Sequence, residues 1–150
     1  MVQKLNLTIR PIAPGEQNDA RDLIQVGLAE RWGILDPGRN PDLESILTHY
    51  RRGVFLVAYL GDELVGTGAL LPETGSTCRI VRMSVRTDLR GRGIGSAILD
   101  ELVRTARTAG YTRIVLETTA AWTDAVAFYR MRGFTSLGVR DGDHHFEREI

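Results

Sequence analysis

Arginine and glycine alternate in the segment Arg90-Gly91-Arg92-Gly93-Ile94-Gly95, a pattern suited to phosphate binding. Glycines allow backbone N–H groups to approach a ligand without interference from side chains. A helix that begins at Ile94 would add unpaired N–H donors and the positive end of its dipole. The two arginines supply the countercharge, since a guanidinium fork matches phosphate geometry. We therefore expect a phosphorylated ligand at this loop.

The elements on either side of the loop strengthen this interpretation. A strand-like run, residues 80–85, comes before it, and apolar residues at helical spacing follow it up to Gly110. The structural alternative is a glycine-rich turn that only packs a helix against a strand. Two arginines, a preceding strand and a long following helix occur together here, and this combination favours ligand binding.

Two common nucleotide-binding patterns fit the loop less well. A P-loop requires a lysine after its last glycine, and the segment has none. A dinucleotide-binding fingerprint shares the strand, the glycines, the helix and a second strand that ends in an acid, Glu117. Its third glycine, however, would fall on Ser96, and the hairpins before Thr77 disfavour a repeating parallel unit. A nicotinamide-dependent oxidoreductase remains the weaker alternative.

The periodicity of apolar residues predicts how the chain positions this loop. Residues 61–62, 72–76 and 141–142 are predicted turns, residues 33–41 a loop, and Asn18 or Asp19 a helix cap. No repeat or linker divides the chain, so we expect one domain over residues 1–150, an α/β fold with a mixed, mostly antiparallel sheet flanked by helices. Strands are predicted at residues 5–10, 54–60, 63–71, 77–85, 113–117, 134–139 and 145–150, and helices at 20–32, 42–51, 94–109 and 122–132.

The composition is that of an ordinary soluble domain. The chain has 19 basic and 19 acidic residues among 150, so no overall field favours nucleic acid or an anionic membrane as partner. Cys78 is the only cysteine, which excludes an internal disulfide and a Cys-rich metal site, and we expect it to be a small apolar filler. The first residues lack the apolar run of a signal peptide, and no stretch is long enough to span a bilayer. We expect a cytoplasmic protein without a metal cofactor.

Three motifs in register resemble the GNAT N-acetyltransferases. Arg90-x-x-Gly93-x-Gly95 resembles the acetyl-coenzyme A loop of that family. The likeness continues through Val115-Leu116-Glu117 and ends in Ala125-Val126-Ala127-Phe128-Tyr129-Arg130-Met131-Arg132-Gly133-Phe134, which is similar to the family's helix-then-Gly-Phe signature. It covers residues 77–134 closely. Arg82-Met83-Ser84-Val85 and Leu116-Glu117-Thr118-Thr119 also resemble the camello-like subgroup.

The resemblance implies a GNAT-like fold, acetyl-CoA as cosubstrate, and direct transfer of its acetyl group to a primary amine in a ternary complex. The acceptor would be a small molecule or a peptide, and a homodimer is common in the family. Tyr129 takes the position of the family's catalytic acid, although a purely structural core tyrosine is the alternative. The implied cofactor-binding residues are Met83, Ser84 and Val85 on the strand, and Arg90, Gly91, Arg92, Gly93, Ile94, Gly95 and Ser96 in the loop.

The general base and the acceptor pocket are less defined. Glu117 ends a strand at the position of the base in some family members, with a salt-bridge role as the alternative and with Glu73 or a water as other candidates. Trp122 stands where many relatives have an asparagine, and an indole cannot copy the hydrogen bonds of an amide. The acceptor pocket is expected near Trp32, Asp36 and one of His144 and His145. A non-catalytic acyl-CoA sensor is the second functional hypothesis.

Overall fold

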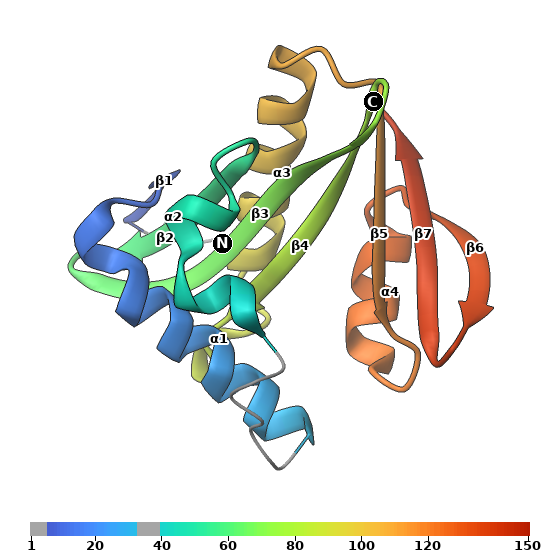
Figure 1. Cartoon of the computed structure of the whole chain (residues 1–150). Helices are drawn as coiled ribbons and strands as arrows, with labels where there is room; N and C mark the ends of the chain where they lie inside the picture. Colours follow the sequence, from blue (N-terminus) through green and yellow to red (C-terminus); the bar gives the residue numbers. More distant parts are fainter. Residues whose placement is uncertain (1–5, 33–39) are drawn as a thin grey trace.

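The computed structural model describes residues 6–32 and 40–150, which form a mixed sheet with helices on both faces (Figure 1). The strand order is β1-β2-β3-β4-β5-β7-β6, and every neighbouring pair is antiparallel except β4 and β5. This arrangement confirms the predicted fold class, and it differs from the repeated parallel sheet of a dinucleotide-binding fold. The strands are β1 Leu7–Pro11, β2 Val54–Leu60, β3 Glu63–Thr74, β4 Thr77–Val85, β5 Arg113–Thr119, β6 Thr135–Arg140 and β7 Asp143–Glu149.

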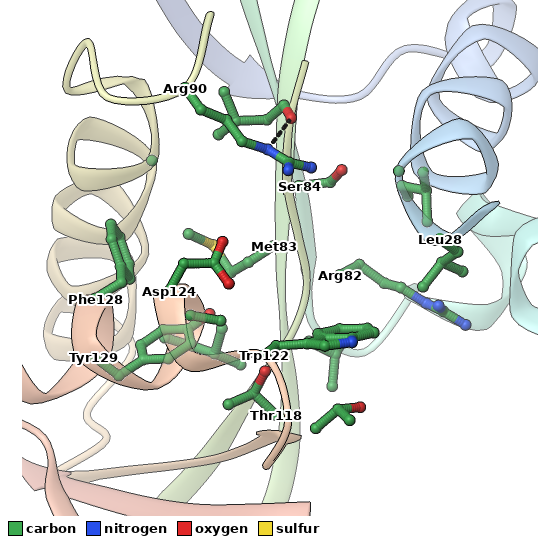
Figure 2. Close-up of a pocket in the computed structure, with 18 of the residues that line it drawn as sticks. Leu28, Arg82, Met83, Ser84, Arg90, Thr118, Trp122, Asp124, Phe128 and Tyr129 are labelled. Carbon is green, nitrogen blue, oxygen red and sulfur yellow. Dashed lines mark hydrogen bonds between the residues drawn. The ribbon is translucent and has the colours of Figure 1, made fainter. Parts of the chain in front are cut away.

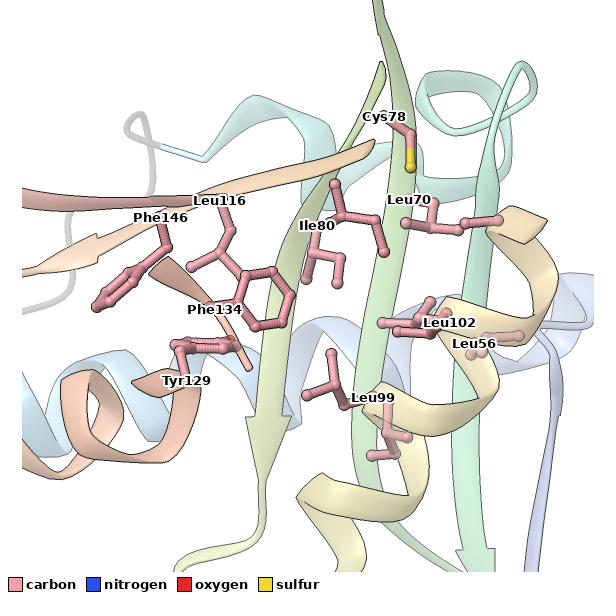
Figure 3. Packing of buried hydrophobic residues seen from close by; sticks show 14 of the residues in the cluster. Leu56, Leu70, Cys78, Ile80, Leu99, Leu102, Leu116, Tyr129, Phe134 and Phe146 are labelled. Carbon is pink, nitrogen blue, oxygen red and sulfur yellow. The ribbon is translucent and has the colours of Figure 1, made fainter. Parts of the chain in front are cut away.

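The helices cover the two faces of the sheet in separate groups, each with its own apolar core. On one face, α3 and α4 bury an apolar cluster that includes Leu99 and Leu102 of α3 and Phe146 of β7 (Figure 3). On the other face, α1 and the short segments after it bury a second cluster around Ile24 and Ile46. The helices are α1 Gln17–Trp32, α2 Ile46–His49, α3 Ile94–Thr108 and α4 Thr123–Met131, with 3-10 turns η1 Pro14–Glu16, η2 Pro41–Glu44 and η3 Thr87–Leu89.

The parallel contact between β4 and β5 is short. Only Thr77, Cys78 and Arg79 of β4 pair with β5, opposite Arg113 to Val115. Beyond this contact the two strands diverge, as Figure 1 shows between the green and brown strands. Within the described residues, the rest of β4 therefore has no strand partner on its β5 side, and its backbone groups there are open to a ligand.

Much of the predicted secondary structure agrees with the fold. The strands at residues 54–60 and 77–85 are confirmed to the residue, as is the start of α3 at Ile94. Gly110 and Gly133 follow α3 and α4 with positive φ angles of 92° and 87°. Such left-handed residues end helices, as expected of glycine. Cys78 is fully buried, and burial raises the pKa of its thiol to about 11, which agrees with an inert filler.

Three local predictions were wrong. The helix expected over residues 42–51 is instead η2 followed by α2, because Ser45 between them is not helical, with φ −145° and ψ 67°. The turn expected at residues 72–76 is shorter, since β3 continues through Pro72 to Thr74 with a register shift that accommodates the proline. Neither Asn18 nor Asp19 caps α1, because η1 leads directly into the helix at Gln17.

Candidate functional site

The gap between β4 and β5 is the centre of a cavity of about 850 Å³. Its walls come from α1 and η2 on one side of β4, from the start of α3 and from α4 on the other, and from the end of β5. Figure 2 shows this arrangement, with Leu28 of α1 and Phe128 of α4 on opposite sides of β4. Nine of the ten predicted cofactor residues line the cavity, namely Met83, Ser84, Val85, Arg90, Gly91, Gly93, Ile94, Gly95 and Ser96.

Arg92 is the predicted cofactor residue that does not line this cavity. Its neighbours Gly91 and Gly93 have φ angles of 78° and 86°, a backbone conformation that favours glycine. Gly93 is the N-cap of α3, and the first turn of this helix contains no acidic residue. The first N–H groups of α3 therefore face the cavity without a competing carboxylate, as an anion-binding helix end requires.

The strand β4 bends where it borders the cavity. Arg82 has a φ angle of 57°, which is rare for a residue with a side chain, and the register between β3 and β4 shifts at this point. Thr67 donates a hydrogen bond of 2.8 Å to the backbone oxygen of Arg82. The Arg82 guanidinium donates to both carboxylate oxygens of Asp42, at 2.9 and 2.6 Å. The backbone oxygen and the side chain of Arg82 are thus both fixed, and these contacts stabilise its unusual backbone conformation.

Asp42 is the centre of a small polar cluster in the cavity wall. The Tyr50 hydroxyl donates to its carboxylate at 2.6 Å, in addition to the two bonds from Arg82. Burial acts to raise the pKa of this carboxyl, but the hydrogen bonds from Arg82 and Tyr50 outweigh it and bring the pKa below its usual value. Burial and the same carboxylate raise the pKa of Tyr50. Asp42 is thus an ionised structural partner.

Tyr129 lies in the last turn of α4, and the residue is 7% exposed. Its ring packs edge-on against Phe128 and Phe134, with centroids 5.1 and 5.6 Å away. Among the described residues no hydrogen bond of the hydroxyl is found, and Tyr129 lines the cavity. Burial raises the pKa of Tyr129, which keeps the phenol protonated at neutral pH. A protonated hydroxyl at a cavity can act as an acid.

Glu117 lies at the edge of the cavity, on β5. Its carboxylate is 3.4 Å from Nδ1 of His145, the residue opposite it on β7, and 3.6 Å from Nη1 of Arg79. The structure therefore contains both the open carboxylate and the salt bridge considered for this residue. Glu73 does not line the cavity. Both of its carboxylate oxygens accept hydrogen bonds from Arg79, at 2.9 and 3.0 Å. This geometry argues against Glu73 as the base.

Trp122 connects the two sides of the cavity at the N-cap of α4. The guanidinium of Arg31 in α1 lies 4.5 Å from the Trp122 ring centroid and donates to both oxygens of Asp124, at 3.0 and 2.7 Å. Trp32 packs against Trp122 with a centroid separation of 5.5 Å, but it does not line the cavity. Asp36 lies outside the described residues.

The two histidines of β7 differ in environment, as expected for neighbours in a strand. His144 is buried, stacks on Phe146 at 4.4 Å and lies 2.6 Å from the Ser136 hydroxyl through Nε2. Neither His144 nor His145 lines the cavity, so the prediction that one of them faces the acceptor pocket is not supported. The residue of this strand that does line it is Asp143.

Sequence reasoning missed the contacts between distant segments. The bonds from Arg82 to Asp42 and from Arg31 to Asp124 join residues 40 and 93 positions apart, and no local pattern signals them. Among the described residues, no three His, Cys, Asp or Glu side chains gather as a metal site would require. No helix in residues 6–32 and 40–150 is long and apolar enough to cross a membrane.

Comparison with known proteins identifies the family. The profile of the acetyltransferase (GNAT) family matches residues 20–134. The chain is 36% identical to the IAA acetyltransferase of Azospirillum brasilense over 71% of each protein. It is 34% identical to rat N-acetyltransferase 8F1 over 66% of this chain, a match that spans about half of that relative (48%). The chain therefore belongs to the GNAT acetyltransferase family.

A solved structure supports the same fold. The PaiA N-acetyltransferase of Thermoplasma acidophilum, determined in complex with coenzyme A, superimposes with a TM-score of 0.85. The alignment covers 96% of this chain and 99% of that one, at 16% sequence identity. At this identity the likeness establishes the fold alone. The GNAT family uses acetyl-CoA as its acyl donor.

Proposed function

We propose that this chain is an N-acetyltransferase that moves the acetyl group of acetyl-CoA to a primary amine of a small molecule or peptide. One observation carries the proposal: a single cavity joins the glycine loop at the start of α3, the open edge of β4 and the hydroxyl of Tyr129. The N–H groups of Gly91 to Ser96 would bind the diphosphate, with Arg90 and Arg92 as countercharge. The backbone of Met83 to Val85 would bind the pantetheine arm and the acetyl group.

The reaction follows from the groups around this path. A free alkylamine has a pKa of about 10.4 and must lose a proton before it can attack a thioester. Glu117, or a water that it orients, would take this proton. The amine nitrogen then forms a bond to the acetyl carbon, and a backbone N–H of β4 would stabilise the oxyanion. Collapse of the intermediate breaks the carbon–sulfur bond, and Tyr129 would protonate the leaving thiolate.

Direct transfer, without an acyl-enzyme, agrees with the nucleophiles that the chain offers. Cys78 is the only cysteine of the sequence. It does not line the cavity, and its thiol has a pKa of about 11. A thiol of such high pKa contains almost no thiolate at neutral pH, so it is a poor acyl carrier.

The proposal is tested by following free thiol release from acetyl-CoA with a panel of primary amines. We expect release that depends on the amine, and intersecting lines when both substrates are varied. Parallel lines would indicate an acyl-enzyme and contradict direct transfer. Binding of acetyl-CoA without release by any amine would favour the sensor hypothesis. A rise in melting temperature with NAD(H) but not with CoA would contradict the proposal altogether.

A further inference from the structure

We propose that His145, on β7, positions Glu117 for removal of the proton from the acceptor amine. His145 would fix one oxygen of the Glu117 carboxylate, so that the other oxygen stays available on the cavity side. This inference rests on the proposed function, in which Glu117, directly or through a water, takes that proton. His145 does not line the cavity, so it would act only through Glu117, as a positioning residue.

The sheet places the two side chains next to each other on one face. Glu117 of β5 lies directly opposite His145 in the antiparallel pairing with β7, and opposite residues point to the same face. Their neighbours Leu116 and Phe146 belong to the apolar core beneath α3 and α4. Because successive side chains of a strand alternate, Glu117 and His145 point to the other face of the sheet. On that face Nδ1 of His145 lies 3.4 Å from Oε2 of Glu117.

A second contact reaches the Glu117 carboxylate from the opposite direction. Nη1 of Arg79, on β4, lies 3.6 Å from Oε2, the same oxygen that His145 contacts. Since β5 lies between β4 and β7, the carboxylate is flanked by a cationic or N–H donor group from each neighbouring strand. No ion pair of Oε1 is found among the residues that the structure describes. Oε1 is therefore the oxygen available to an amine or to a water.

Of these two contacts, the one from His145 is directed at Glu117 alone. Arg79 donates through Nε and Nη2 to both oxygens of Glu73, so its charge is already matched by another carboxylate. His145 has no ion-pair partner other than Glu117 within the described part of the chain. Gly138, the residue opposite it on β6, has no side chain that could compete for the ring. Without His145, Arg79 would draw the carboxylate of Glu117 toward β4.

A cross-strand contact that only stabilises the sheet is the structural alternative, and the same two strands contain one. Nε of Arg113 on β5 donates to Glu147 of β7 at 2.7 Å. Neither of these residues lines the cavity, whereas Glu117 does. A positioning role for His145 predicts a loss of turnover, while a structural role predicts only a loss of stability. Glu147, two residues along the strand from His145, therefore provides a matched control.

The test measures amine-dependent thiol release by H145A, H145N and E147Q, with urea unfolding of each variant. We expect H145A to lower kcat about tenfold and to leave the KM for acetyl-CoA unchanged, since a misplaced base slows the reaction without weakening the cofactor. H145N should retain most of the kcat, because its amide nitrogen can take the place of Nδ1 and donate to Glu117. E147Q should keep the wild-type kcat. Should H145A not fold, H145L serves, with the same expected loss.

Combination with E117Q determines whether His145 acts through Glu117. In the E117Q background, H145A should change the residual kcat little, because the carboxylate that His145 positions is absent. An unchanged kcat in H145A overturns the inference, as does an equal loss in H145A and H145N. A full tenfold loss in the E117Q background is equally contrary, because His145 would then act by another route. A wild type that releases no thiol with any amine overturns the proposed function instead.

Discussion

The two walls of the cavity, on either side of β4, differ in whether their polar groups are paired within the protein. The wall of α3 and α4 has N–H groups after Gly93 with no acidic residue in the first turn of the helix, and its Arg132 has no carboxylate partner among the described residues. On the wall of α1 and η2 the charges are paired within the protein, as in Arg82 with Asp42. Donors without a protein partner suit an invariant anionic ligand such as a cofactor. Charges that are paired within the protein leave a nearly neutral surface instead. Under the proposed function, the first wall would bind the cofactor and the second would bind the acceptor.

The largest effect is expected at Tyr129, on the α4 side of the cavity. Tyr129→Phe should lower kcat about a hundredfold, the usual loss when a general acid is removed. The KM for acetyl-CoA should change little, because the ring and its packing remain. Since burial raises the pKa of Tyr129, activity of the wild type should not fall at mildly alkaline pH through loss of this proton.

Steady-state kinetics of Tyr129→Phe beside Tyr111→Phe would measure this effect. Tyr111 packs against the same apolar core but does not line the cavity, so its hydroxyl should be dispensable. Equal kcat values in the two variants would remove Tyr129 from the mechanism and leave it as a core residue.

The acceptor wall provides the next prediction, which concerns stability. Asp42→Asn should lower the free energy of unfolding by about 2 kcal/mol, because Arg82 loses a charged partner in a largely buried place. The folded-state pKa of Asp42 lies below its unfolded value, so its contribution is complete above that unfolded value and disappears as the pH falls through the folded one. The difference between wild type and variant should therefore be largest near neutral pH and shrink in acid.

Urea unfolding at several pH values checks this, with Asp88→Asn as the control. Asp88 accepts the same two-nitrogen contact, from Arg86 at 2.7 and 3.2 Å, but it is largely exposed. Its replacement should have a much smaller effect, as for surface ion pairs in general. A similar loss of unfolding free energy in both variants would show that burial does not strengthen the contribution of the Asp42 pair to stability.

The same contrast between the walls explains what the sequence could predict. The loop and α3 in the cofactor wall are formed by contiguous residues, so the local sequence predicted the glycines of residues 91–95, the period of α3 and the cap at Gly110. The acceptor wall depends on pairs such as Arg82 with Asp42, which join segments 40 residues apart and carry no local signal. The prediction for the segment around Ser45 was wrong because Ser45 is not helical, with φ −145° and ψ 67°, and helical periodicity does not signal this break. The sequence does not distinguish the environments of Glu73 and Glu117. The fold does, because both oxygens of Glu73 accept hydrogen bonds from Arg79.

The smallest expected effect compares the two ends of α3 within the cofactor wall. Gly93 and Gly110 have positive φ angles of 86° and 92°, and a Cβ atom at either would meet nothing within 4 Å. Replacement by alanine should therefore cost a similar free energy of unfolding at both, about 1 kcal/mol of backbone strain. Only Gly93→Ala should also raise the Kd for coenzyme A, by roughly threefold to tenfold, because it disturbs the N–H groups that would face the diphosphate. Urea unfolding and calorimetric titration of both variants separate the two effects. If Gly110→Ala weakened coenzyme A as much as Gly93→Ala, general loosening of α3 would account for both, and the N-terminal end of the helix would lose its special role in binding.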